Sequence, residues 1–283
     1  MRRRRAGFVA AGVIATGGLL ALLTSFAGLL NQPRRDFVAW RYLQTAETEL
    51  TGRPIHRAAA DHDLKRALAL GGENPALVAR AGQLLVACED WQAAMAALGQ
   101  TSLNTLELRS SYGQCLIKTG HREEGIEMIL RSAAAAQVEH NRGLMSSGAY
   151  ATVANDAGYL LVDANAHVEA GANLVAAAVA LVPLEPSFCD SLGWALHKLH
   201  RNDEAIFYLE RSVRQQLPRP DPALLYHLGV VYAIADRVPE AQEMLTWCLR
   251  DDPENAGASE ELRRLHRVLP SPAWALGLDV APS

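Results

Sequence analysis

Residues 190–194 read Asp-Ser-Leu-Gly-Trp, and the Leu-Gly pair returns 36 residues later in residues 227–229, which read His-Leu-Gly. Ala205 and Ala241 each follow the glycine of their own pair by 12 residues. Small residues that recur at a fixed offset indicate an internal repeat, because a small side chain lets one helix approach another closely. The sequence therefore predicts repeated pairs of packed helices.

The same spacing continues toward the amino terminus of the chain. The first copy lacks the glycine but keeps Ala60, Leu64 and Ala67 at the matching offsets. The repeat-packing residues predicted by this register are Gly82, Ala94, Gly113, Gly158, Ala170, Gly193, Ala205, Gly229 and Ala241. A single helical hairpin cannot bury its apolar face alone, so successive units are expected to stack, with an insertion at about 138–150.

These residues resemble the tetratricopeptide repeat (TPR), which has a small residue at its eighth position and an alanine at its twentieth. The best copies are residues 186–218 and 222–254, and the resemblance covers about 230 residues. It implies an all-α, TPR-like superhelical solenoid of helical hairpins over residues 38–255. Residues 256–269 are expected as a capping helix and residues 270–283 as an extended tail. The repeats also look like those of membrane-anchored bacterial scaffold proteins.

The amino-terminal residues predict a membrane anchor. Residues 6–30 carry no charge, and as a helix they would be about 37 Å long, which exceeds a hydrocarbon core of about 30 Å. The arginines of the basic end, residues 1–5, are expected to stay in the cytoplasm, which places the repeats in the periplasm beyond a linker at 31–37. The alternative is a cleaved signal at Ser25-Phe26-Ala27, which would give a secreted periplasmic TPR protein.

Composition and motif searches argue against several classes of function. The formal net charge is −4, and it is −8 without the arginines of residues 1–5, so nucleic acid is not an expected partner. The sequence contains no nucleophile elbow, phosphate-binding loop or zinc-protease motif, and no cofactor or metal is expected. The cysteines have no metal-ligand spacing, although Cys88 and Cys115 lie on adjacent units and are candidates for a disulfide.

The resemblance implies that the first helices of the units line a concave groove that binds a protein or peptide. The groove positions transferred from the family are Asn155, Tyr159, Asp163, Asp190, Trp194, His197, Lys198 and Tyr226. The lysine- and asparagine-lined clamp for carboxylates that some family members use is absent at these positions. Rigid aromatic residues beside polar ones are suitable anchors for a peptide.

The functional hypothesis is a non-catalytic, membrane-tethered scaffold or adaptor that holds its client in this groove. One alternative is a structural subunit of an envelope secretion, polysaccharide-export or protease-adaptor assembly, in which a neighbouring subunit fills the groove. A second alternative is an enzyme with its site in the insertion, around Glu139, His140 and Asn141. The identity of the client and the oligomeric state are not encoded in any recognisable motif.

Overall fold

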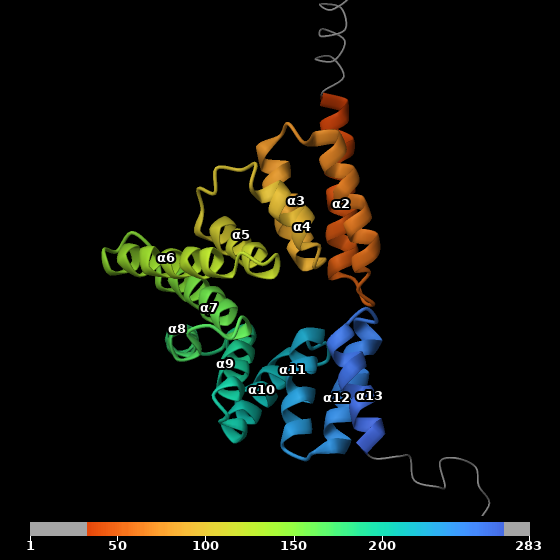
Figure 1. The fold of residues 1–283 in the computed structure, drawn as a ribbon, viewed down its shortest axis with the longest axis vertical. Coiled ribbons are helices and arrows are strands. Elements are labelled where there is room, and N and C mark those ends of the chain that lie inside the picture. Colours follow the sequence, from red (N-terminus) through yellow and green to blue (C-terminus); the bar gives the residue numbers. More distant parts are fainter. Residues whose placement is uncertain (1–32, 269–283) are drawn as a thin grey trace, which may run out of the picture.

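The computed structural model describes residues 33–268, and every regular element among them is a helix (Figure 1). The predicted basic end (1–5), transmembrane helix (6–30) and extended tail (270–283) lie outside the described residues. Among the helices that are described, none combines the length and apolar character needed to cross a membrane.

The helices follow one another as hairpins along the chain. Their bounds are residues 33–51, Arg57–Gly71 (α2), Pro75–Ala87 (α3), Trp91–Leu98 (α4), Leu106–Lys118 (α5), Arg122–Asn141 (α6), Ser147–Asp163 (α7), Val168–Leu181 (α8), Pro186–Lys198 (α9), Asn202–Gln216 (α10), Pro222–Ile234 (α11), Val238–Asp251 (α12) and Ala256–Val268 (α13). The last of these is the predicted capping helix.

Three of the hairpins begin with the same local signal. Helices α3, α9 and α11 each start at a proline, which has no N–H to leave unpaired in the first helical turn. The residue before each proline caps the helix, and Asp221 shows the arrangement clearly because its Oδ1 accepts a hydrogen bond of 2.8 Å from the Ala223 N–H. Local sequence therefore fixes where these first helices begin.

The glycines of the repeat lie where the two helices of a hairpin touch. A β-carbon added to Gly193 would lie 2.6 Å from Cγ of Leu209, and one added to Gly229 would lie 2.7 Å from Cγ of Leu245. Real β-carbons do not approach neighbours this closely, so each glycine is needed for the close contact between its two helices. Gly82 and Gly113 have equivalent surroundings, with Leu98 and Ile129 as their neighbours.

One packing residue was predicted in the wrong register. Ala170 is exposed, and Gly171 occupies the place expected for it, because a β-carbon on Gly158 would lie 2.6 Å from the Gly171 carbonyl oxygen. Four residues, 164–167, separate α7 from α8, whereas three residues separate the helices in the hairpins α9–α10 and α11–α12. The extra residue in the turn shifts the register of α8 by one residue, so the packing position falls at Gly171 and not at Ala170.

Two segments differ from their predicted form. Residues 33–37, expected as part of a linker, are the first turns of the helix over 33–51, and Pro33 is tolerated there as the first helical residue. The insertion at 138–150 mainly lengthens helices that are already present, so α6 has 20 residues and α7 has 17, against 13 for α9.

Candidate functional site

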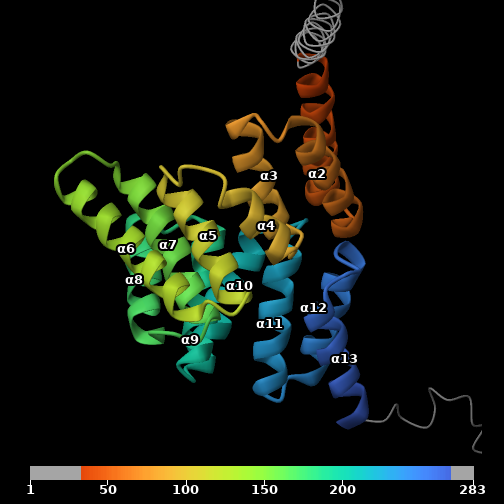
Figure 2. The ribbon, with the colours of Figure 1, turned by 45° about the horizontal axis from the view of Figure 1, so that its top comes forward.

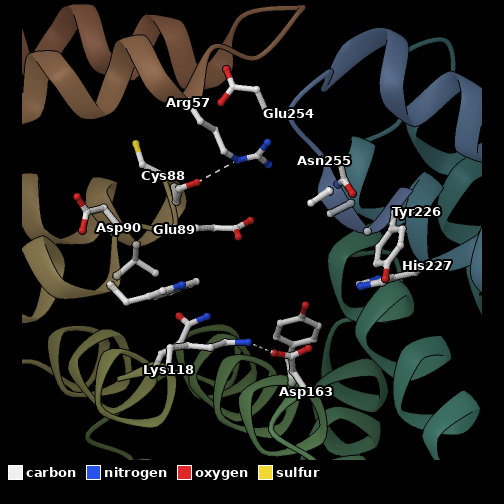
Figure 3. A pocket seen from close by; sticks show the side chains of 18 of the residues that line it. Arg57, Cys88, Glu89, Asp90, Lys118, Asp163, Tyr226, His227, Glu254 and Asn255 are labelled. Atoms are coloured by element: carbon white, nitrogen blue, oxygen red, sulfur yellow. Dashed lines mark hydrogen bonds and ion pairs between the residues drawn. The ribbon is translucent and has the colours of Figure 1, made fainter. Parts of the chain in front are cut away.

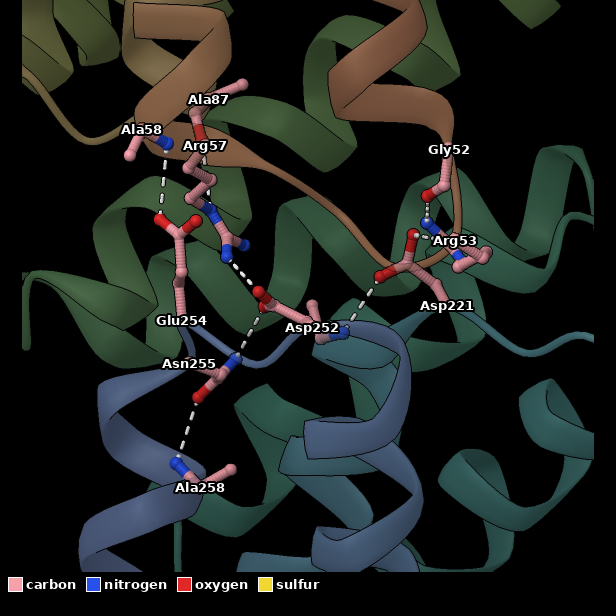
Figure 4. Close-up of polar contacts among 11 residues, drawn as sticks. Gly52, Arg53, Arg57, Ala58, Ala87, Asp221, Asp252, Glu254, Asn255 and Ala258 are labelled. Atoms are coloured by element: carbon pink, nitrogen blue, oxygen red, sulfur yellow. Dashed lines mark hydrogen bonds and ion pairs between the residues drawn. The ribbon is translucent and has the colours of Figure 1, made fainter.

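The two ends of the repeat array meet, which brings residues almost 200 positions apart in the sequence together (Figures 1, 2 and 4). The Ile55 N–H donates a hydrogen bond of 2.8 Å to the Asp251 carbonyl oxygen, and the Ala58 N–H donates one of 3.2 Å to Glu254 Oε2. The Arg57 guanidinium pairs with the Asp252 carboxylate. We call this contact between residues 52–58 and residues 251–255 the terminal seam.

The ion pair of the terminal seam is mostly buried. The Asp252 side chain is 1% exposed and the Arg57 side chain 20% exposed. Burial opposes the Arg57 charge, but the hydrogen bond and the charge of Asp252 outweigh it and raise the pKa of Arg57 above its usual value. Asn255 Nδ2 also donates to Asp252 at 3.2 Å, so the buried carboxylate has a partner on each oxygen.

The concave side of the array contains a cavity of about 1110 Å³ (Figure 3). Its walls come from helices that are distant in sequence, from α2 at one end of the array to the start of α13 at the other. Six of the eight predicted groove residues line it, and these are Tyr159, Asp163, Trp194, His197, Lys198 and Tyr226. The register transferred from the repeat therefore brings these side chains from α7, α9 and α11 to a single place.

One wall of the cavity is aromatic. The Trp194 ring stacks on the His227 ring with centroids 4.3 Å apart, and the Tyr226 ring lies 6.4 Å from Trp194. Lys198 Nζ lies 4.6 Å from the Trp194 ring centroid, within reach of a cation–π contact. Trp194 is only 6% exposed, so it supports the wall and presents little of its own surface to the cavity.

The other two predicted groove residues do not line the cavity. The Asp190 carboxylate accepts a hydrogen bond of 2.8 Å from His227 Nδ1 and so orients the imidazole that Trp194 stacks on. Asn155 is buried in α7, where its amide nitrogen donates a hydrogen bond of 3.2 Å to Asp156 Oδ1. Asp190 therefore positions a residue of the wall, Asn155 contacts a neighbour on its own helix, and neither lines the cavity.

The opposite wall carries cavity-lining residues that the sequence did not predict. Arg57, Glu89, Trp91 and Glu254 lie there, on the first units and at the terminal seam. Lys118 also lines the cavity, and its Nζ lies 3.1 Å from Asp163 Oδ2. Lys118 follows Gly113 by five residues, as Lys198 follows Gly193, so the same register applied to an earlier unit would have found it.

Burial shifts the pKa of three side chains that line the cavity, Tyr159, Tyr226 and His197, toward favouring their uncharged forms. Desolvation raises the pKa of the Tyr159 and Tyr226 hydroxyls, and it lowers the pKa of His197 below its usual value. At neutral pH Tyr159, Tyr226 and His197 therefore offer uncharged hydroxyl and imidazole groups to the cavity. Among the described residues no group of three or more His, Cys, Asp or Glu side chains is placed to hold a metal ion.

The remaining candidates from the sequence do not form a site in residues 33–268. Cys88 and Cys115 are free, and burial raises the pKa of their thiols to about 12 and about 11. His140, from the proposed enzymatic insertion, stacks on Tyr150 with ring centroids 4.8 Å apart, and its Nδ1 lies 3.2 Å from the Met145 carbonyl oxygen. These contacts give His140 a packing role at the end of α6.

The fold is an all-helical, TPR-like solenoid, as the repeat register predicted. No protein-family model and no curated protein sequence matches the chain. Among solved structures, a thermophilic TPR protein from Thermus thermophilus is similar, with a TM-score of 0.51 and 16% identity over 66% of this chain and 96% of that chain. The APC/C hetero-tetramer Cut9–Hcn1 is similar with a TM-score of 0.52 and 17% identity, over 87% of this chain and 45% of that chain. At these identities the likeness establishes the fold.

Proposed function

We propose that this protein is a non-catalytic scaffold that binds a segment of a protein client in its concave cavity, and that residues 6–30 tether it to a membrane. The observation that carries the proposal is the convergence of three successive units on one cavity, where the half-buried Tyr159 and Tyr226 line the wall and the buried Trp194 supports it. Aromatic side chains with few rotatable bonds bury large areas at little entropic cost, which suits them as anchors for a partner.

The size and lining of the cavity favour a peptide segment over a small metabolite. Its volume of about 1110 Å³ lies just above the range of about 300–1000 Å³ that small-molecule sites occupy. The aromatic wall stands opposite charged side chains such as Lys118 and Glu89. A cavity lined in this way can contact both the side chains and the backbone polar groups of a peptide segment.

Removing side chains from the cavity should release the client. We expect Tyr226→Ala combined with Lys198→Ala to lose the principal crosslinked partner in intact membranes, as measured by crosslinking and mass spectrometry. The matched control is Phe207→Ala, because Phe207 is 57% exposed on α10 and does not line the cavity. Circular dichroism checks that the double variant stays folded. An unchanged set of partners for the double variant would count against the cavity as the binding site.

The membrane tether is tested by deletion of residues 1–32. We expect the shortened protein to move from the membrane fraction to the soluble fraction, because the uncharged segment 6–30 is then missing. Its helicity per residue should not fall, since the stacked helices begin at residue 33. Retention of the shortened protein in the membrane fraction would contradict the tether.

A further inference from the structure

The five repeats that have a packing glycine turn from their first helix to their second through a residue with positive φ, seven residues after that glycine. These residues and their φ angles are Glu89 (63°), Gly120 (97°), Asn165 (51°), His200 (60°) and Asp236 (57°). Glycine adopts this left-handed conformation without strain and asparagine tolerates it, whereas glutamate adopts it at a cost. The geometry of the turn between α3 and α4 therefore does not explain why a glutamate stands at this position.

Glu89 is the one residue of these five that lines the cavity. Its side chain points into the open middle of the cavity, toward the wall that carries Tyr226 and His227 (Figure 3). Within residues 33–268 no hydrogen bond or ion pair holds its carboxylate, although its charge acts on Arg57 and on the Tyr159 hydroxyl. A strained backbone thus presents an exposed carboxylate to the binding surface.

The surrounding charges are dominated by carboxylates. Five acidic residues line the cavity against three cationic ones, and the acidic residues are Asp61, Glu89, Asp90, Asp163 and Glu254. Two of the three cations are engaged, since Arg57 pairs with Asp252 and Lys118 pairs with Asp163. The third, Lys198, lies over the Trp194 ring.

Glu254 is the second carboxylate of the cavity that pairs with no cation in the part of the chain that the structure describes. It accepts one hydrogen bond, from the Ala58 N–H at the terminal seam. Asp61 and Asp90, in contrast, share Lys65, whose Nζ lies 2.8 Å and 2.6 Å from their carboxylate oxygens. Glu89 and Glu254 are therefore the two carboxylates of the cavity that pair with no cation among residues 33–268.

We infer that the cavity recognises a basic side chain, arginine or lysine, of an extended client segment, with Glu89 as its charge partner. The inference rests on the proposed function and names the chemistry of the client. A guanidinium pairs with a carboxylate through two parallel hydrogen bonds and packs its flat face on an aromatic ring, so Glu89 opposite Tyr226 matches an arginine on both counts. A client segment with acidic side chains would meet Glu89 and Glu254 as repelling charges.

Glu89→Gly separates a binding role from a structural one. Glycine relieves the left-handed strain and removes the carboxylate, so we expect the Tm to rise by about 2–3 °C while binding of a basic peptide weakens about tenfold. Glu89→Gln, which keeps the strain and removes only the charge, should weaken binding similarly without raising the Tm. A Glu89→Gly variant that binds the basic peptide as well as the wild type would overturn the inference.

The binding probes are three fluorescein-labelled nonapeptides of repeating Ala-Leu-Arg, Ala-Leu-Gln and Ala-Leu-Glu, titrated against the full chain in detergent by fluorescence anisotropy. We expect the arginine peptide to bind at least about tenfold more tightly than the glutamate peptide, with the difference shrinking as salt is added. Glu139→Gln is the matched control, because Glu139 is exposed on α6 and does not line the cavity.

The outcomes distinguish the inference from the proposed function on which it rests. If the arginine and glutamine peptides bind equally and Tyr226→Ala weakens both, the cavity binds peptides but the charge preference is wrong. If no peptide binds, or if Tyr226→Ala leaves binding of the arginine peptide unchanged, recognition of a basic peptide in the cavity is wrong. The crosslinking experiment then decides separately whether the cavity holds a client.

Discussion

Replacing Gly158 by alanine is expected to destabilise the protein by about 2–3 kcal/mol. The new β-carbon would lie 2.6 Å from the Gly171 carbonyl oxygen and 2.7 Å from Cγ2 of Val175. The first neighbour is backbone, which cannot move by a side-chain rotation, so α7 and α8 must separate. Urea unfolding followed by circular dichroism measures the loss.

The control for this substitution lies on the same helix. Gly148 is also in α7, but a β-carbon added there meets no atom within 4 Å. Gly148→Ala is therefore expected to leave stability unchanged or to raise it by about 0.5 kcal/mol, because alanine favours the helix over glycine. Equal effects of the two substitutions would show that close helix contact is not the reason for the glycine at position 158.

Replacing Arg57 by alanine is expected to open the terminal seam and to cost about 3 kcal/mol in the free energy of unfolding. The substitution leaves the carboxylate of Asp252, whose side chain is 1% exposed, without its cation. A buried charge without a partner is strongly unfavourable, so the two loops are expected to part and let water reach it. Urea unfolding measures the stability, and small-angle X-ray scattering measures the increase in radius of gyration.

The control is an ion pair of the same chemistry on the surface. Arg131 and Glu127 lie one turn apart on α6 with side chains 80% and 67% exposed. Arg131→Ala is expected to change stability by less than about 0.5 kcal/mol, because an exposed pair gains little over hydration of the separate charges. If Arg57→Ala behaves like Arg131→Ala, the seam does not hold the ends of the array together.

Much of the candidate site followed from the repeat register alone. Trp194 and Tyr226 were placed on the concave side because each stands at a fixed offset from a packing glycine, and the structure puts both on the cavity wall. Asn155 was placed by the same rule but is buried and does not line the cavity, because the register fixes the face of a helix but not the depth of each side chain. The prediction that Ala170 is a packing residue was wrong because a fixed spacing does not allow for the extra residue in the turn between α7 and α8.

The sequence by itself determined the class of structure: small residues at regular offsets require helices that pack in pairs, and this information is local to each unit. It also determined which face of the first helices lines the cavity. Only the tertiary structure decided that Arg57 meets Asp252 and that Glu89 stands opposite Tyr226. Small rotations between neighbouring units add up along an array, so the place where its two ends meet depends on every unit at once. No sequence pattern within a single repeat predicts this combined rotation.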